Sequence, residues 1–219
     1  MKLRICHLYG NLMNTYGDNG NLLMLQHRAK KLGYEVETTL ISLEEDFNSD
    51  DFDIVMFGGG QDFEQTVVAK DLQNKKEALI QYIEDNGVVV AICGGFQLLG
   101  RYYVNASGER LNGISAIDVY TNGQFPNRLI GDVEIVNEEF GETYLGYENH
   151  IGRTYLGKNM KPLGKVVKGY GNNEEDHVEG CHYKNAFCSY FHGPILVRNQ
   201  HLADRIIETA AERQRSKNA

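Results

Sequence analysis

The stretch that most constrains the fold is Asn86 to Gly100, which reads NGVVVAICGGFQLLG. Asn86-Gly87 marks the end of a helical segment, and Val88 to Ile92 is an unbroken, mostly β-branched apolar run. Such a run predicts a strand that is buried on both faces, and Gly94-Gly95 then opens an apolar segment with helical spacing. Cys93 is therefore predicted to lie between a central parallel strand and a helix, at the sheet edge where open α/β folds bind ligands.

Two roles are open for Cys93. A helix amino terminus favours negative charge, which predicts a sulfur that is readily held as the nucleophilic thiolate. Gly94 suits a strained turn, and the amide that follows the cysteine can serve as an oxyanion donor. The alternative is a small buried apolar side chain, which is the role of most unpaired cysteines.

Length and composition narrow the class of protein. The 219 residues are enough for one sizeable α/β domain, and we predict a single domain over residues 1–219. The net charge of −8 argues against nucleic-acid binding as the main function. No apolar run approaches the roughly 20 residues of a membrane helix, and the amino terminus lacks a signal-peptide core. A cytoplasmic protein without membrane insertion is therefore expected.

The cysteines do not suggest a structural framework or a metal site. They are too few and too scattered for a disulfide scaffold, and no C-x-x-C pair is present. They stand at Cys6, Cys93, Cys181 and Cys188. We expect no bound metal.

The order of predicted elements indicates a doubly wound, mostly parallel α/β sheet through about residue 105. Strands are expected at Leu3–Tyr9, Tyr34–Ile41, Ile54–Phe57 and Val88–Ile92, and helices at residues 22–33, Asp62–Leu72 and Lys75–Asp85. Short β-prone runs between Gly108 and Phe191 predict antiparallel strands that extend the sheet or form a second layer. These runs are Asp132–Val136, Thr143–Tyr147, Lys165–Val167 and Ala186–Phe191. A helix closes the chain, with a polar tail, Arg213–Ala219, that is expected to fray.

A second candidate feature is Gly58-Gly59-Gly60, which directly follows the strand Ile54–Phe57. Three glycines after a strand permit backbone amides to point inwards at an anion. A tight turn is the alternative interpretation.

A cysteine nucleophile needs a base, and His192 is favoured among the seven histidines. It follows the apolar run Ala186–Phe191 and precedes Gly193-Pro194, which predicts a loop at the end of a strand. His150 is the rival, in the polar stretch YENHIGRT. A purely structural histidine is the alternative for either position.

Several segments carry a resemblance to a known family. They are GGGQDFEQ, AICGGFQLLG, GYENHIGRT, GYGNN and SYFHGPIL. In this order and spacing they resemble class I glutamine amidotransferases of the cobyric-acid-synthase-like (CobB/CobQ-like) branch. NTYGDNGNLLMLQHRAKKLG, NRLIGD and HYKN resemble more specifically the glutaminase subunits of bacterial lipid II isoglutaminyl synthases. The resemblance covers nearly the whole chain and implies a flavodoxin-like fold.

The resemblance also implies a reaction. Cys93 would attack the side-chain amide carbon of L-glutamine, and His192 would protonate the departing ammonia. His192 would then activate water to hydrolyse the glutamyl thioester. Backbone amides of Gly59 or Gly60, together with Gly94, would hold the oxyanion.

By the same resemblance, Arg128 is the candidate for binding the substrate, because its guanidinium suits bidentate recognition of a carboxylate. A surface arginine is the alternative reading. Further expected pocket residues are Gln97, Asn149, His150 and Arg153.

One departure from the family pattern concerns the third catalytic group. Many class I amidotransferases place a glutamate two residues after the catalytic histidine, whereas this chain has Pro194 there. We therefore expect a partner chain to supply the carboxylate that orients His192. An acid elsewhere in this chain is the alternative, with Glu64, Glu148 and Glu179 as the first candidates.

The chain lacks a recognisable ATP site, because Gly146 to Thr154 has the wrong spacing for a phosphate loop and carries Arg153 in place of the lysine. No cofactor is expected here, and ATP and Mg²⁺ are expected on a partner. The resemblance implies a heterodimer with a Mur-ligase-like (MurT-like) synthetase subunit, which uses the ammonia to amidate D-glutamate of the lipid II stem peptide during peptidoglycan synthesis at the inner face of the membrane. The alternatives are a glutaminase for another cobyric-acid-type synthetase, and a non-enzymatic redox-sensing or binding protein of the same fold.

Overall fold

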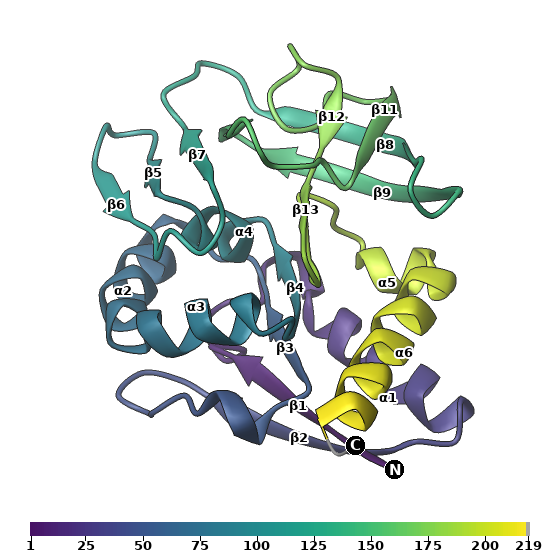
Figure 1. Cartoon of the computed structure of the whole chain (residues 1–219). Coiled ribbons are helices and arrows are strands. Elements are labelled where there is room, and N and C mark those ends of the chain that lie inside the picture. Colours follow the sequence, from purple (N-terminus) through teal and green to yellow (C-terminus); the bar gives the residue numbers. More distant parts are fainter. Residues whose placement is uncertain (218–219) are drawn as a thin grey trace.

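The central sheet has the strand order of a flavodoxin-like protein. The computed structural model describes residues 1–217 and arranges six strands as β13-β14-β4-β3-β1-β2 (Figure 1). The parallel strands are β1 (Lys2–Leu8), β2 (Glu35–Ile41), β3 (Ile54–Phe57), β4 (Val88–Ile92) and β14 (Ala186–Ser189). β13 (Cys181–Tyr183) pairs antiparallel with β14 at one edge. If the parallel strands are numbered in chain order, their spatial order across the sheet from the β2 edge is 2-1-3-4-5. This order confirms the predicted doubly wound class.

Helices cover both faces of this sheet. Val88, Val90 and Ile92 of β4 face one apolar cluster, and Val89 and Ala91 face the other, because successive side chains of a strand point to opposite faces. The first cluster is closed by α1 (Asn19–Lys31), α5 (Ile195–Arg198) and α6 (Gln200–Lys217), and the second by α2 (Asp62–Leu72), α3 (Lys76–Glu84) and α4 (Gly94–Leu99). Short 3₁₀ turns lie at Thr15–Gly17, Ser49–Asp51 and Gln73–Lys75.

Two further sheets are present. One contains β10 (Arg153–Leu156), β7 (Val119–Asn122), β5 (Tyr102–Val104) and β6 (Arg110–Asn112). The other contains β12 (Val178–Glu179), β11 (Gly164–Lys168), β8 (Leu129–Asn137) and β9 (Glu142–His150). In Figure 1 both lie above the carboxyl ends of the central parallel strands. They therefore form the upper wall of any binding site at the carboxyl ends of the parallel strands.

Three of the runs predicted as antiparallel strands, Asp132–Val136, Thr143–Tyr147 and Lys165–Val167, are confirmed in the second of these sheets. The prediction is wrong for the fourth run, Ala186–Phe191, because β14 pairs in parallel with β4 in the central sheet.

The predicted fraying of Arg213–Ala219 is wrong for the part of the tail that the structure describes. Helix α6 continues to Lys217 because polar side chains in its last turns find backbone partners. Arg213 Nε donates to the carbonyl of Asp85 at 3.1 Å, and Gln214 Nε2 donates to that of Lys2 at 2.9 Å. Residues 218–219 lie outside the described residues.

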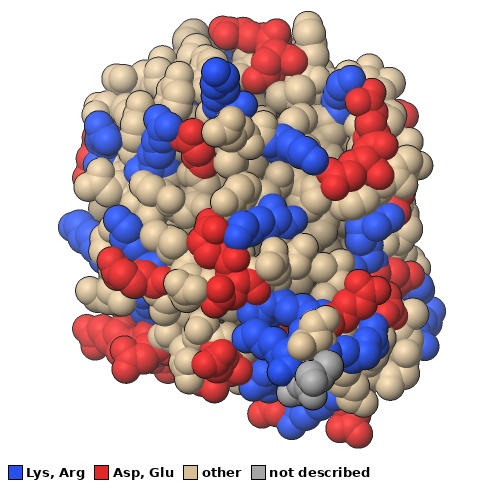
Figure 2. Space-filling model, in the orientation of Figure 1, with Lys and Arg blue, Asp and Glu red and all other residues tan. Residues whose placement is uncertain are grey.

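Figure 2 shows basic and acidic side chains interspersed over most of the face in view, with several basic side chains gathered in its lower part. Within residues 1–217, no helix is long and apolar enough to cross a membrane.

Candidate active site

Cys93 occupies the predicted turn between β4 and α4, at the carboxyl edge of the central sheet. Its backbone has φ 49° and ψ −103°, a conformation that costs a residue with a side chain about 1–3 kcal/mol. The two following glycines permit this turn. A Cβ on Gly94 would lie 2.8 Å from Gln65 Nε2, and one on Gly95 would lie 2.5 Å from the carbonyl oxygen of Phe57. The strained turn presents the sulfur at the edge of the sheet.

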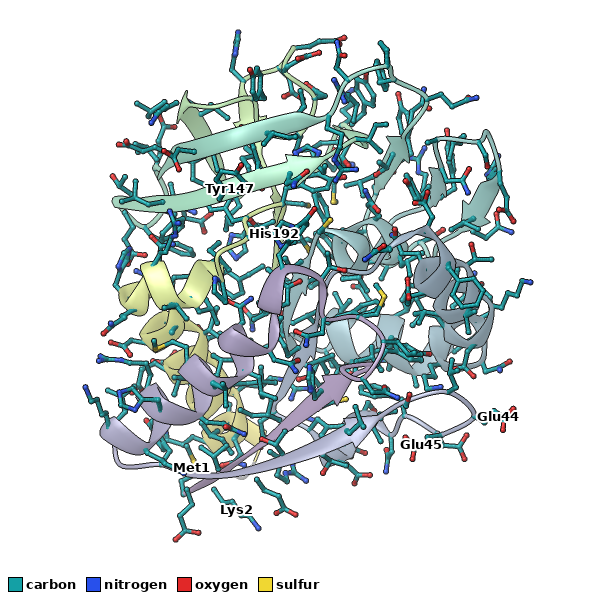
Figure 3. The ribbon with its side chains drawn as sticks, turned by 180° about the vertical axis from the view of Figure 1, so that it is seen from behind. Met1, Lys2, Glu44, Glu45, Tyr147 and His192 are labelled. Carbon is teal, nitrogen blue, oxygen red and sulfur yellow. The ribbon has the colours of Figure 1, made fainter. Side chains whose placement is uncertain are left out.

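His192 reaches the same edge because β14 and β4 run in parallel. Its backbone is held by a two-way bridge to β9: His192 N donates to Tyr147 O at 2.8 Å, and Tyr147 N donates to His192 O at 3.2 Å. Figure 3 shows the two residues side by side. A Cβ on Gly59 would lie 3.2 Å from Cys93 Cβ and 3.4 Å from His192 Cε1. The structure therefore brings the two predicted residues together against the glycine loop.

Asp18 completes this group, and sequence reasoning missed it. Its Oδ1 lies 3.2 Å from His192 Nδ1, and its Oδ2 accepts the Gly59 N–H at 2.7 Å. The residue is 1% exposed. This contact removes the reason for expecting the carboxylate from a partner chain and corrects that expectation.

The three acids suggested within the chain serve elsewhere. Glu148 accepts the amides of Tyr170 and Gly171 at 2.7 and 2.9 Å. Glu179 accepts the Tyr190 amide at 2.6 Å, and burial raises the pKa of its carboxyl to about 8. Glu64 lines the pocket next to Cys93. None of these three carboxylates therefore orients His192.

The surroundings of His192 favour its charged form. Burial lowers the pKa of the ring, but the hydrogen bond to Asp18 and the interaction with Cys93 outweigh burial and raise the pKa to about 10. Nε2 makes no hydrogen bond of normal geometry with any described residue. An imidazolium with Nε2 available can protonate a leaving group beside the sulfur.

Of the two glycines predicted as alternative oxyanion donors in the loop, the structure leaves Gly60. Gly59 is not available for that role in this structure, because its N–H is taken by Asp18. Gly60 N lies 2.9 Å from where a Cβ on Gly94 would stand. Gly60 and Gly94 are thus close neighbours, and their role as oxyanion donors stays a prediction.

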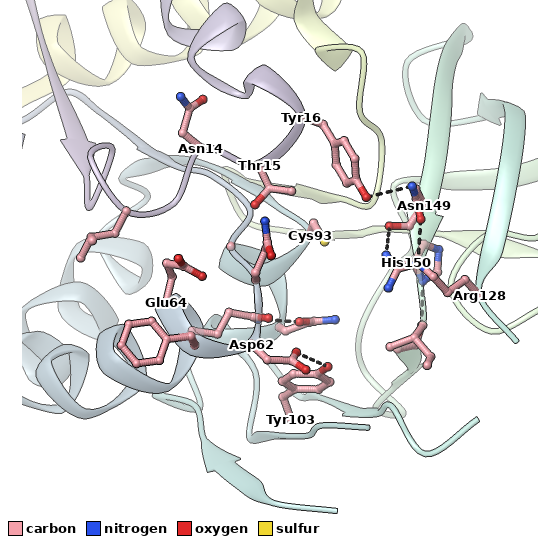
Figure 4. Close-up of a pocket in the computed structure, with 18 residues that line it drawn as sticks. Asn14, Thr15, Tyr16, Asp62, Glu64, Cys93, Tyr103, Arg128, Asn149 and His150 are labelled. Atoms are coloured by element: carbon pink, nitrogen blue, oxygen red, sulfur yellow. Dashed lines mark hydrogen bonds between the residues drawn. The ribbon is translucent and has the colours of Figure 1, made fainter. Parts of the chain in front are cut away.

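A pocket of about 860 Å³ opens in front of Cys93 (Figure 4). Gln97 forms part of its wall, accepting from Gln65 Nε2 at 2.7 Å and donating to the Tyr190 hydroxyl at 3.1 Å. His150 lies in the wall with Nδ1 at 2.7 Å from Gly152 O and its ring stacked 3.8 Å from that of Tyr190. Burial lowers the pKa of His150. These contacts fit a neutral wall residue, whereas His192 has the contacts expected of the base.

Arg128 and Asn149 both line the pocket, and the role of Arg128 in binding substrate stays a prediction. The exposed Arg128 donates from Nε to Asn149 Oδ1 and from Nη2 to Asn149 O, both at 2.8 Å. The expectation that Arg153 lines the pocket is wrong. Its guanidinium is buried and donates to the carbonyls of Asn127 and Ile151, each at 2.8 Å, so it stabilises the loop before β8.

Comparison with known proteins identifies the family of this chain. Residues 4–200 match the CobB/CobQ-like glutamine amidotransferase domain. The chain is 59% identical over 213 residues to the GatD subunit of the glutamine-hydrolysing lipid II isoglutaminyl synthase of Streptococcus pneumoniae, which covers 97% of this chain and 82% of that protein. Identity to the corresponding Staphylococcus aureus subunit is 43%, over 97% of this chain and 86% of that protein.

A solved structure shares the fold. The crystal structure of a glutamine amidotransferase superposes with a TM-score of 0.61 at 14% identity, covering 94% of this chain and 98% of that one. At this identity the likeness supports the architecture alone.

Proposed function

The chain belongs to the CobB/CobQ-like glutamine amidotransferase family, and from that premise we propose that it is the glutaminase subunit of a lipid II isoglutaminyl synthase. It hydrolyses L-glutamine to glutamate and ammonia. The ammonia passes to a Mur-ligase-like (MurT-like) ATP-dependent subunit, which amidates D-glutamate of the lipid II stem peptide. The two GatD subunits, at 59% and 43% identity over nearly the whole chain, support this specific assignment.

The observation that carries the reaction is the group Cys93, His192 and Asp18 at the edge of the pocket. The thiolate attacks the amide carbon of glutamine, and the carbonyl electrons move to the oxygen. The tetrahedral intermediate then collapses, the C–N bond breaks, and the His192 imidazolium gives its Nε2 proton to the departing ammonia. A glutamyl thioester remains on Cys93.

Water completes the turnover. His192, now neutral, accepts a proton from a water molecule, which attacks the thioester carbon and releases glutamate from the Cys93 sulfur. Asp18 holds Nδ1–H throughout, so the ring keeps the tautomer in which Nε2 exchanges the proton. Amides of Gly60 and Gly94 stabilise the oxyanion in both steps.

Arg128 binds the carboxylate of the substrate in this proposal. A guanidinium at the pocket mouth offers a planar pair of donors, and the side-chain amide of glutamine then extends towards Cys93. ATP and Mg²⁺ act on the partner subunit, and the reaction takes place on the cytoplasmic side of the membrane.

The test is an amidation assay with purified components. The chain is combined with the Mur-ligase-like subunit encoded in the same organism, ATP, Mg²⁺, glutamine and lipid II, and the product is identified by mass spectrometry. We expect a loss of about 1 Da on the stem peptide, which Cys93→Ser prevents unless free ammonium replaces glutamine. Glutamine hydrolysis without lipid II amidation would favour a different synthetase of the cobyric-acid type.

A further inference from the structure

We propose that Tyr16 and Asn149 are positioning residues that set the length of substrate the site accepts, by holding Arg128 at a fixed distance from Cys93. This inference rests on the proposed function, in which Arg128 binds the α-carboxylate of glutamine and Cys93 attacks its amide carbon. The distance between these two groups then decides which amino-acid amide fits.

Arg128 and Cys93 belong to different parts of the fold. Cys93 follows β4 of the central sheet, whereas Arg128 directly precedes β8 of an antiparallel sheet. The arginine is exposed, and an arginine side chain that is free in solution samples many rotamers. Some contact must therefore fix its guanidinium relative to the sulfur.

Asn149 provides the first half of that contact. It accepts Arg128 Nε with Oδ1 and Arg128 Nη2 with its backbone carbonyl, both at 2.8 Å. Because Nε and Nη2 lie in the plane of the guanidinium, these two hydrogen bonds fix both its position and its orientation. They leave the Nη1 side for a substrate carboxylate.

Tyr16 provides the second half. Asn149 Nδ2 donates to the Tyr16 hydroxyl at 2.9 Å, and this bond holds the amide so that Oδ1 points to Arg128. The Tyr16 ring packs edge-on against that of His192, with 4.8 Å between ring centroids. Figure 4 shows Tyr16, Asn149 and Arg128 joined in a row beside Cys93.

The loop that carries Tyr16 is itself anchored to the catalytic group. Thr15 N donates to Gly59 O at 2.9 Å, and Asp18 holds both Gly59 and His192. Tyr16 has φ 57°, an uncommon value for a residue with a side chain, so the loop accepts strain in placing this ring. The row from Arg128 to His192 therefore works as a spacer between the carboxylate site and the nucleophile.

The experiment measures alkylation of Cys93 by two electrophilic amino acids that differ by one methylene. 6-Diazo-5-oxo-L-norleucine has the length of glutamine, and 5-diazo-4-oxo-L-norvaline has the length of asparagine. Labelling of the full chain is followed by mass spectrometry, and iodoacetamide, which carries no carboxylate, reports the intrinsic reactivity of the sulfur. The wild-type protein should react much faster with the longer probe.

Tyr16→Phe removes the hydroxyl and keeps the ring on His192, and Asn149→Ala removes the amide. Since one neutral hydrogen bond is worth about fivefold, we expect Tyr16→Phe to lower the ratio of the two rates about fivefold, and Asn149→Ala to lower it at least as much. The double variant should lower the ratio of the two rates no further than Asn149→Ala does, because both substitutions interrupt the same series of hydrogen bonds. Iodoacetamide rates should stay within twofold of wild type.

Tyr102→Phe is the matched control, because Tyr102 packs on Tyr120 of β7 outside the pocket, with 5.6 Å between ring centroids. It should leave the ratio unchanged. An unchanged ratio in Tyr16→Phe, or strictly additive effects in the double variant, would overturn the inference. If the wild-type protein does not react with the longer probe at Cys93, the proposed function itself fails.

Discussion

Asp18→Asn tests the catalytic group most directly, because it changes the charge of one side chain and almost none of its shape. Asp18 satisfies two donors, the His192 Nδ1–H at 3.2 Å and the Gly59 N–H at 2.7 Å. An asparagine offers one oxygen and one NH₂ group. In the variant, one of the two donors must therefore face another donor, and the imidazolium loses its buried counter-charge.

The expected size of the effect follows from these contacts. A hydrogen bond to a charged group is worth about 1.5–3 kcal/mol, and a buried donor left unpaired costs about 1–3 kcal/mol. Each 1.4 kcal/mol on the barrier is roughly tenfold in rate, so kcat should fall by about 10²- to 10⁴-fold. The same substitution in a Ser-His-Asp triad costs about 10⁴.

The assay is steady-state release of glutamate from glutamine by the complete two-subunit enzyme. Asp53→Asn is the matched control, because Asp53 is also a buried aspartate that accepts a backbone amide, from Arg4 at 2.8 Å, but at the opposite edge of the sheet. It should lower the melting temperature and leave kcat nearly unchanged. If Asp18→Asn keeps kcat within threefold of wild type, the assignment of Asp18 as the orienting acid is wrong.

Three further outcomes are expected. Cys93→Ala should abolish glutamine hydrolysis with no change in melting temperature beyond about 1–2 °C, and substantial residual turnover would end the nucleophile assignment. Arg128→Lys should raise KM for glutamine at least tenfold with little change in kcat, since a point ammonium cannot reproduce the planar fork; unchanged kinetics would make Arg128 a plain surface residue. Because the pKa of His192 is raised from 6.5 to about 10, the stability that its charge contributes should be complete below pH 6.5 and lost as pH rises through about 10. Denaturant titrations of wild type and His192→Gln should therefore converge above that pH, and a constant difference would contradict the ion-pair description.

The sequence predicts the central sheet well because its signals are local. Ile54–Phe57, Asp62–Leu72 and Val88–Ile92 coincide with β3, α2 and β4. An unbroken apolar run and a helical repeat are each read from neighbouring residues. The sheets between β5 and β12 depend instead on pairings across long stretches of chain, such as β5 with β7 and β11 with β8. Short β-prone runs indicate that strands exist there, but their partners are decided by packing.

The same contrast holds for the site. Cys93 and His192 stand at strand ends that local patterns reveal, whereas Asp18 is one acid in a turn-rich loop, NTYGDNGN. The available signal was its place after β1, since the carboxyl ends of parallel strands meet at one edge. Arg153 shows the opposite error. The family resemblance suggested the pocket, but the backbone carbonyls of Asn127 and Ile151 hold its guanidinium elsewhere.

The presence of Asp18 changes what a partner subunit has to contribute. With an acid already at His192 Nδ1, the partner is not needed to supply an orienting carboxylate, and coupling of hydrolysis to synthesis must act at another point.

The pocket lining offers such a point, because it includes Tyr16 and Phe63, which are 53% and 76% exposed. We therefore expect partner binding to lower KM for glutamine, by covering the exposed Tyr16 and Phe63, and to leave the alkaline limb of the kcat/KM profile unchanged. A carboxylate donated in trans would instead raise the pKa of His192 further and move that limb to higher pH. The pH dependence of kcat/KM, measured over pH 6–11 for the free chain and for the complex, distinguishes these two possibilities. A shift of the alkaline limb by one pH unit or more on partner binding would refute the conclusion that Asp18 alone supplies the orienting carboxylate.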